Sequence, residues 1–160
     1  MLQNYELEPV TRLDGAGLTI GIVVARYNWH ITGAMLRLAT DELLTQGVAQ
    51  DAIHVLMVPG SYELAFGAKV LLQHVSCHAA ICFGCVMKGE TRHDVVVADA
   101  AGQSIQRVAL DTGVPIIFGV VCAETQQQAE ARVVRGRECA QAAIEMALLP
   151  QRLSSVHRGE

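Results

Sequence analysis

Four near-continuous apolar runs, separated by longer segments of helical periodicity, constrain the fold of this chain more than any other feature of its sequence. The runs cover residues 18–25, 53–58, 79–87 and 115–122. Such runs are typical of parallel strands that are buried on both faces of a sheet. Their alternation with helices predicts one α/β domain over residues 1–160, a three-layer sandwich around a four-stranded parallel sheet with right-handed crossovers.

Two helices are predicted between the first three runs. Apolar residues recur at helical spacing over residues 31–44, and Gly47 is expected to end that helix. A second helix is expected over residues 64–75, after a turn at 59–61. Residues 1–17 precede the first run, and we interpret them as a leading arm.

Further helices are predicted after the third and fourth runs. One is expected over residues 91–112, before a Gly-Val-Pro stop signal. Another begins at Thr125, the first residue of a capping box, and is expected to be interrupted at Gly136. A last helix is expected over residues 138–149, ended by the proline that follows, with a polar tail at 151–160.

The helix expected over residues 91–112 is apolar nearly all round. Its apolar residues are too many for one stripe: Val95, Val96, Val97, Ala98, Ala100, Ala101, Ile105, Val108, Ala109 and Leu110. A helix of this kind is buried on more than one side. One face is expected to meet its own sheet, and the other is predicted to meet another subunit.

Composition excludes several classes of protein. The net charge is −4 and the Lys and Arg residues are scattered, which argues against a nucleic-acid surface. No apolar run reaches the roughly 18–20 residues that a membrane span needs, and the first residues do not resemble a signal peptide. Five cysteines, an odd number within apolar stretches, favour free thiols in the cytoplasm over a disulfide framework.

Polar clusters follow each apolar run, where a parallel sheet presents the carboxyl ends of its strands. Ligands of open α/β sheets bind at this edge. The clusters cover residues 26–28, 59–63, 88–93 and 122–125. Their convergence on one edge predicts a binding site there.

The third cluster combines a glycine with a helix start. Backbone N–H groups and the positive end of the helix dipole at Thr91 form an anion site; alternatively, Thr91 and Asp94 form a capping box. His93 is either a general acid or base near neutral pH or a polar surface residue.

Other candidate residues have simpler alternatives. Tyr27 either stacks on a planar ring or packs as an ordinary aromatic residue, and Ser61 is at least a good helix N-cap. Cys82 and Cys85 form a C-x-x-C pattern, but side chains three apart in a strand diverge. We therefore expect no redox or metal site from them, and no metal site elsewhere.

Together these clusters resemble the lumazine synthase family. The similarity runs from about Gly15 to Leu149 and rests on motifs in the family's order and spacing. These are Ile20-Gly21-Ile22-Val23-Val24-Ala25-Arg26-Tyr27-Asn28, Val58-Pro59-Gly60-Ser61-Tyr62-Glu63, the stretch from Gly84 to His93, the stretch from Leu110 to Val120, and Ala143-Ile144-Glu145-Met146-Ala147.

The resemblance implies a flavodoxin-like fold and a defined reaction. The family condenses 5-amino-6-(ribitylamino)uracil with 3,4-dihydroxy-2-butanone 4-phosphate to 6,7-dimethyl-8-ribityllumazine, phosphate and water, with no cofactor or metal. It implies that Tyr27 stacks on the pyrimidine, that Gly60, Ser61 and Glu63 hold the ribityl and ring polar atoms, and that Val86 and Met87 line the ring slot. It further implies phosphate binding by the backbone of Glu90 and Thr91 and by Arg132, proton transfer by His93, and Phe118 from an adjacent subunit.

The resemblance also implies a homopentamer or a multiple of one, in which the leading arm pairs with a neighbour's sheet. Pentamer, decamer and 60-subunit shell stay open. The sequence departs from the family at Asp94-Val95-Val96, where aromatic residues are usual, in its alanine-rich 98–101 stretch, and after Arg132, where a loop is about five residues shorter. That gap makes Arg135 the alternative phosphate ligand. The alternative function is a flavin- or lumazine-binding carrier or shell protein.

Overall fold

The computed structural model describes residues 13–157, with side chains through residue 155. Strands and helices alternate along the chain as the sequence predicts. The strands are β1 (Ile20–Ala25), β2 (Ile53–Val58), β3 (Ala79–Met87) and β4 (Ile116–Ala123). The helices are α1 (Trp29–Thr45), α2 (Leu64–His74), α3 (His93–Thr112), α4 (Gln126–Ala131) and α5 (Arg135–His157), with short 3₁₀ turns η1 (Gln50–Ala52) and η2 (Ser61–Glu63).

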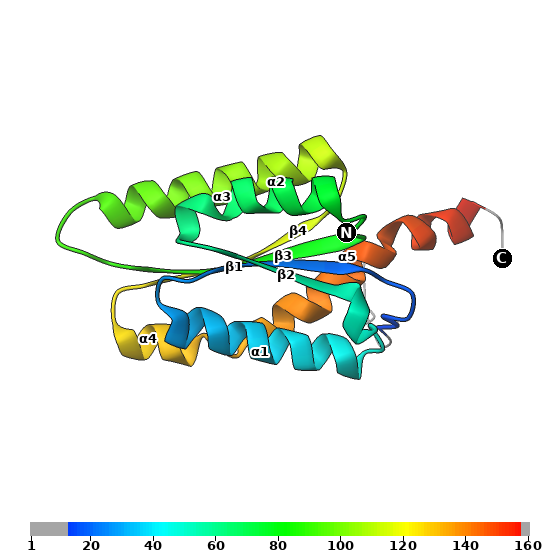
Figure 1. Cartoon of the computed structure of the whole chain (residues 1–160), viewed down its shortest axis with the longest axis horizontal. Coiled ribbons are helices and arrows are strands. Elements are labelled where there is room, and N and C mark those ends of the chain that lie inside the picture. Colours follow the sequence, from blue (N-terminus) through cyan, green and yellow to red (C-terminus); the bar gives the residue numbers. More distant parts are fainter. Residues whose placement is uncertain (1–12, 158–160) are drawn as a thin grey trace, which may run out of the picture.

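The four strands form one parallel sheet in the order β2-β1-β3-β4. Helices α1, α4 and α5 cover one face of this sheet, and α2 and α3 cover the other (Figure 1). This arrangement confirms the predicted three-layer α/β sandwich with a flavodoxin-like layout. All carboxyl ends of the strands therefore lie at one edge, which is where the polar clusters gather.

Burial on both faces explains the apolar runs. All six residues of β1 and the first eight of β3 are buried, because these central strands have helices above and below them. Odd and even positions of each strand feed two separate apolar clusters, one for each helical layer. A sheet with one solvent-exposed face would instead show polar and apolar residues alternating along each strand.

Helix α1 ends as predicted, but the start of α3 corrects one expectation. Gly47 follows α1 with φ 96°, a conformation that favours glycine. Helix α3 begins at His93, two residues later than expected. The Thr91 hydroxyl accepts a hydrogen bond from the His93 N–H at 3.3 Å, so the Thr91–Asp94 capping box does not form.

The cap of α4 is formed much as predicted. The Thr125 hydroxyl accepts a hydrogen bond from the Gln128 N–H at 3.2 Å. The Gln128 side-chain oxygen accepts from the Glu124 N–H at 2.8 Å, one residue before the position that a regular capping box uses.

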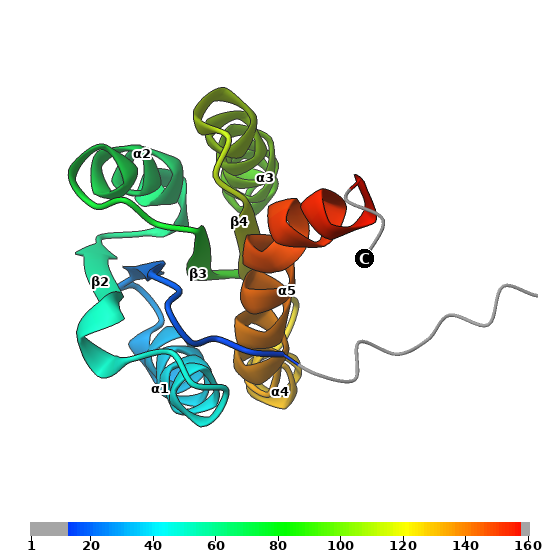
Figure 2. The ribbon, with the colours of Figure 1, turned by 90° about the vertical axis from the view of Figure 1, so that its right-hand side faces the viewer.

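The last helix differs from the sequence-based expectation at both ends. Helix α5 starts at Arg135 and runs to His157, through Gly136 and Pro150. Gly136 does not interrupt a helix: a Cβ there would lie 2.5 Å from the Met35 carbonyl oxygen, so glycine lets α5 approach α1 closely. Pro150 removes one helical hydrogen bond and bends α5 rather than ending it, and the C-terminal turns run at an angle to the rest (Figure 2).

The leading arm falls largely outside the described residues. Residues 1–12 are not described, so its pairing with a neighbour's sheet stays a prediction. At the end of the arm, the Gly15 N–H donates to the Gln46 carbonyl oxygen at 2.7 Å, which fastens this part to the end of α1 in the same chain. Among residues 13–157, the helices are all too short or too polar to cross a membrane.

Candidate active site

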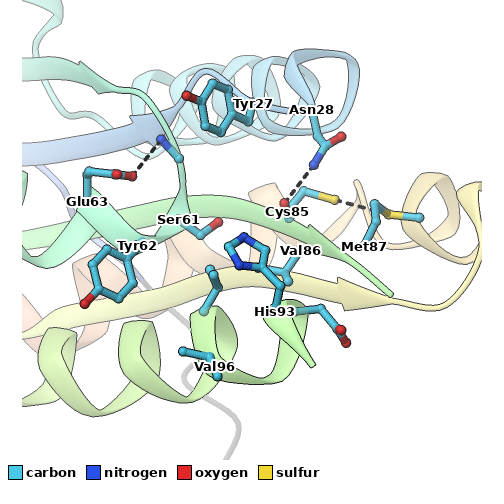
Figure 3. Close-up of a pocket in the computed structure, with 13 residues that line it drawn as sticks. Tyr27, Asn28, Ser61, Tyr62, Glu63, Cys85, Val86, Met87, His93 and Val96 are labelled. Atoms are coloured by element: carbon cyan, nitrogen blue, oxygen red, sulfur yellow. Dashed lines mark hydrogen bonds between the residues drawn. The ribbon is translucent and has the colours of Figure 1, made fainter. Parts of the chain in front are cut away.

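A cavity of about 580 Å³ opens at the carboxyl edge of the sheet, between the strand ends and α3 (Figure 3). Three of the four predicted polar clusters contribute to its wall. Of the residues proposed from the sequence, it brings together Tyr27, Gly60, Ser61, Glu63, Val86, Met87 and His93. It also includes residues for which the sequence analysis predicts no role in binding: Asn28, Tyr62, Cys85, Asp94, Val96 and Val97.

Asn28 shapes the first wall of this cavity. Its backbone has φ 60° and ψ 44°, a left-handed conformation that asparagine tolerates better than most residues. Its side-chain amide donates to the Cys85 carbonyl oxygen at 2.9 Å and so ties the β1 end to β3. An asparagine between a strand and a helix is a sequence signal for such a turn. The turn leaves the neighbouring Tyr27 side chain 61% exposed at the cavity mouth.

The turn before α2 holds two polar groups in fixed places. The Gly60 N–H donates to the Glu63 carboxylate at 3.0 Å. A Cβ at Gly60 would lie 2.8 Å from the Tyr27 ring, so glycine is what allows that ring to lie against the turn. Tyr27, Gly60 and Glu63 therefore form one connected wall.

Ser61 carries the most informative polar atom of the cavity. The residue is only 6% exposed, and within the described residues its hydroxyl has no hydrogen-bond partner. Gly84 of β3 lies directly against it, since a Cβ at that position would lie 2.3 Å from the hydroxyl oxygen. A buried hydroxyl without a partner is unfavourable by about 1–3 kcal/mol.

The end of β3 forms an apolar floor. Val86 and Met87 line the cavity, and the Cys85 sulfur lies 3.8 Å from the Met87 sulfur. Burial, with a smaller contribution from Cys122, raises the pKa of Cys85 to about 11. Burial also raises the pKa of Cys82 to about 12. Both thiols are therefore protonated at neutral pH, and they lie on opposite faces of the sheet, as the strand spacing predicts.

The start of α3 places His93 and Asp94 in the cavity wall. Glu90 and Thr91 do not line the cavity; they lie exposed in the loop that precedes α3. An ion pair between Lys88 and Glu124, at 3.2 Å, joins this loop to the end of β4. Among the residues that the structure describes, there is no group of three His, Cys, Asp or Glu side chains placed to hold a metal ion.

Phe118 and Arg132 lie away from this cavity. They line a second hollow of about 210 Å³, beside the edge strand β4, together with Met35, Cys122 and Arg135. The two hollows share no lining residue. Within one chain, the proposed site residues thus divide between two hollows, with Glu90 and Thr91 in a loop that lines neither.

A family model and individual relatives of this chain carry the same name. A family model described as 6,7-dimethyl-8-ribityllumazine synthase matches residues 17–151. The chain is similar to proteins of that name from Polynucleobacter necessarius, 41% identical over 86% of this chain and 81% of the relative, and from Paracidovorax citrulli, 41% identical over 89% and 94%. The protein of that name from Cupriavidus necator is 39% identical over 94% of this chain and 90% of its own length.

Proposed function

The chain belongs to the 6,7-dimethyl-8-ribityllumazine synthase family, and we propose that the cavity beside His93 is one half of its active site. The protein is a transferase of riboflavin biosynthesis. It condenses 5-amino-6-(ribitylamino)uracil with 3,4-dihydroxy-2-butanone 4-phosphate to 6,7-dimethyl-8-ribityllumazine. The relatives named above carry the synthase name, and they lend no support to the carrier or shell alternative.

The ribityl pyrimidine is assigned to the wall formed by Tyr27 and the turn before α2. The unpaired Ser61 hydroxyl carries this assignment, because a polyhydroxylated chain supplies the partner that it lacks. The exposed Tyr27 ring offers a face for stacking on the pyrimidine. Val86 and Met87 form an apolar slot beneath that ring, and Glu63 is held in place to accept a hydrogen bond from a ring N–H.

The butanone phosphate is assigned to the start of α3. Backbone N–H groups at Glu90 and Thr91 precede this helix, and the positive end of its dipole favours an anion. His93 stands between the two substrates in this assignment. It takes and returns protons while the amine condenses with the ketone and releases water, phosphate leaves, and the ring closes with loss of a second water.

A second copy of the chain completes the site in this proposal. Phe118 and Arg132 are assigned to the neighbouring subunit's half, because in one chain they line a separate hollow. The exposed apolar residues of α3 supply a contact surface for a homopentamer or a multiple of one. We assign the reaction to the cytoplasm, in keeping with five free cysteines.

The reaction is tested with purified protein and both substrates, by following the fluorescence of the lumazine product. We expect turnover from wild type. Ser61→Ala removes one charge-neutral hydrogen bond and should weaken the ribityl pyrimidine by roughly three- to tenfold. The affinity for the butanone phosphate should be unchanged. Equal weakening of both substrates would contradict the assignment of Ser61.

A further inference from the structure

Asp94 places a half-buried carboxylate in the wall of the cavity. It is the second residue of α3, directly after His93, and both residues line the same space. Glu63 is the only other carboxylate among the described residues of this wall, and none of them is a lysine or arginine. The cavity of one chain is therefore acidic beside the residue to which we assign proton transfer. Aromatic residues are usual at this point in the family, so the carboxylate is a feature of this chain.

Within the described part of the chain, the Asp94 carboxylate has neither a hydrogen bond nor an ion pair. The start of α3 explains this, because the Thr91 hydroxyl accepts from the His93 N–H and no capping box engages Asp94. Glu63, by contrast, accepts a hydrogen bond from the Gly60 N–H at 3.0 Å. Of the two carboxylates in the wall, Asp94 is the one whose oxygens are all available to a ligand.

The Asp94 carboxylate faces the strand ends rather than open solvent. Burial raises the pKa of the Cys122 thiol, and the negative charges of Asp94 and then Asp99 raise it further. Cys122 belongs to β4 and is the strand partner of Val86, which lines the cavity floor. The Asp94 charge is therefore felt at the same strand ends that form the cavity, in keeping with its half-buried position. His93, on the same turn of α3, points its ring into the cavity (Figure 3).

The two substrates respond in opposite ways to this carboxylate. A phosphate group at neutral pH carries nearly two negative charges, and Asp94 repels it. The ribityl pyrimidine has no phosphate and presents an amino group and ring N–H groups, all of them hydrogen-bond donors. Hydrogen bonds from such donors to a carboxylate are roughly twice as strong as those to a neutral oxygen. The wall at Asp94 therefore suits the amine and not the phosphate.

We propose that Asp94 is a second catalytic residue, whose carboxylate binds the 5-amino group of the ribityl pyrimidine and takes a proton from it as the amine attacks the ketone. This inference rests on the proposed function of the cavity. A bond forms between the amine nitrogen and the ketone carbon, one N–H bond breaks toward Asp94, and the ketone oxygen takes a proton from protonated His93.

The loss of water restores both residues. Asp94 returns its proton to the new hydroxyl group, and the C–O bond breaks so that this group leaves as water. Neutral His93 takes the remaining proton of the nitrogen as the C=N bond forms. Asp94 is again a carboxylate and His93 is again protonated, so the pair needs no other acid or base for this step.

Steady-state kinetics of Asp94→Asn tests this role, because the amide keeps the size of the side chain but cannot take the proton. The value of kcat should fall roughly ten- to a hundredfold. KM for the butanone phosphate should stay within about threefold of wild type or fall, because the repulsion of phosphate is removed. Asp94→Glu keeps a carboxylate and should retain more turnover than Asp94→Asn.

Asp99→Asn is the matched control, because Asp99 is an exposed aspartate of the same helix that does not line the cavity. It should keep the kcat and both KM values of wild type. If Asp94→Asn behaves like Asp99→Asn, the inference is wrong. It is also wrong if Asp94→Asn turns over faster than wild type, because the carboxylate then only repels phosphate.

Binding of an analogue without the 5-amino group separates this inference from the proposed reaction. Isothermal titration calorimetry compares 6-(ribitylamino)uracil with the complete ribityl pyrimidine. Wild type should bind the complete substrate roughly tenfold more tightly than the analogue, and Asp94→Ala should bind the two alike. Absence of lumazine formation with wild type would overturn the reaction but not this result. Equal preference for the 5-amino group in wild type and Asp94→Ala would overturn the role of Asp94 even if the reaction proceeds.

Discussion

The two helical layers on this sheet differ in how completely one chain buries them. In the layer of α1 and α5, large side chains such as Met35 and Ile144 are fully buried against the sheet and each other. In the opposite layer, α3 has twenty residues, of which only Ala101 and Ile105 are buried. Val96 is 59% exposed and Leu110 is 72% exposed. The first layer buries most of its large side chains within one chain, although Leu44, Met146 and Leu149 stay about 40% exposed. Helix α3 leaves most of its apolar side chains uncovered.

Charge follows the same division as burial. The cavity wall beside α3 is acidic, and the arginines lie by the β4 edge at the start of α5. In the proposed assembly, a second copy of the chain would complete both the apolar layer and the charge balance of the site. The predictions below compare the two layers directly.

The largest effect is expected from Leu110→Glu on α3. A charge placed in an apolar interface is unfavourable by several kcal/mol at each contact, so the assembly should dissociate and activity should fall more than a hundredfold. Sedimentation velocity and lumazine formation measure the two outcomes. Leu44→Glu, at a partly exposed leucine of α1, is the control, and this variant should keep the size of the assembly and the activity of wild type. A Leu110→Glu assembly of unchanged size would show that α3 is not an interface.

In the layer of α1 and α5, Ile144→Ala should act on the fold rather than on the assembly. Ile144 is fully buried between α5 and the sheet. Its truncation should lower the free energy of unfolding by about 2–5 kcal/mol, because a cavity remains. Urea denaturation at a fixed subunit concentration measures this change. Val96→Ala on α3 is the corresponding substitution in the other layer. If it lowers the unfolding free energy of dissociated chains as much as Ile144→Ala does, the comparison between the two layers is contradicted.

His93→Ala at the start of α3 should lower turnover by roughly one to two orders of magnitude. Positioning of the two substrates supplies much of the remaining rate, so the residue assists without being indispensable. The affinity for the ribityl pyrimidine, followed by fluorescence of the single tryptophan, should stay near wild type. Full turnover of the variant across neutral pH would show that His93 has no part in proton transfer.

The smallest effect concerns a polar contact inside the layer of α1 and α5. The Glu42 side chain, 11% exposed, accepts hydrogen bonds from Gln46 at 2.8 Å and Gln141 at 3.0 Å and lies 3.7 Å from Arg137. The hydrogen bonds from Gln46 and Gln141, and then the charge of Arg137, lower the pKa of Glu42 below its usual value.

Because this folded-state pKa is lowered, the stabilisation by Glu42 is present above the unfolded-state pKa and is lost as the pH falls through the folded-state value. Glu42→Gln should therefore flatten the fall in unfolding free energy on the acid side of about pH 4.5. At neutral pH it should lower that free energy by no more than about 1 kcal/mol. Urea titrations at pH 7 and pH 4 measure both changes, and a pH dependence identical to wild type would contradict this role.

The strands and the strand-end site could be predicted because their causes are local to the sequence. Burial on both faces produces unbroken apolar runs, and parallel strands bring Tyr27, Ser61 and His93 to one edge. The end of α5 could not be predicted in this way, because the proline rule concerns one hydrogen bond and the helix continues past Pro150. Gly136 was misread because its contact, the Met35 backbone, is about a hundred residues away in the chain.

Two features of the site also depend on distant contacts. The cavity role of Asn28 follows from its hydrogen bond to the Cys85 carbonyl, which no local pattern contains. The separation of Phe118 and Arg132 from the cavity follows from the order of the strands and from the place of Arg132 at the end of α4.

A mixing experiment tests most directly the central claim, that each site is shared between two copies of the chain. One variant, His93→Ala, is impaired in the cavity; the other, Arg132→Ala, is impaired in the hollow beside β4. After joint refolding in equal amounts, random assembly should give about a quarter of interfaces with both halves intact. Activity should then rise to about a quarter of wild type, well above the mean of the separate variants. Activity equal to that mean would show that each chain builds its site alone and would contradict the account.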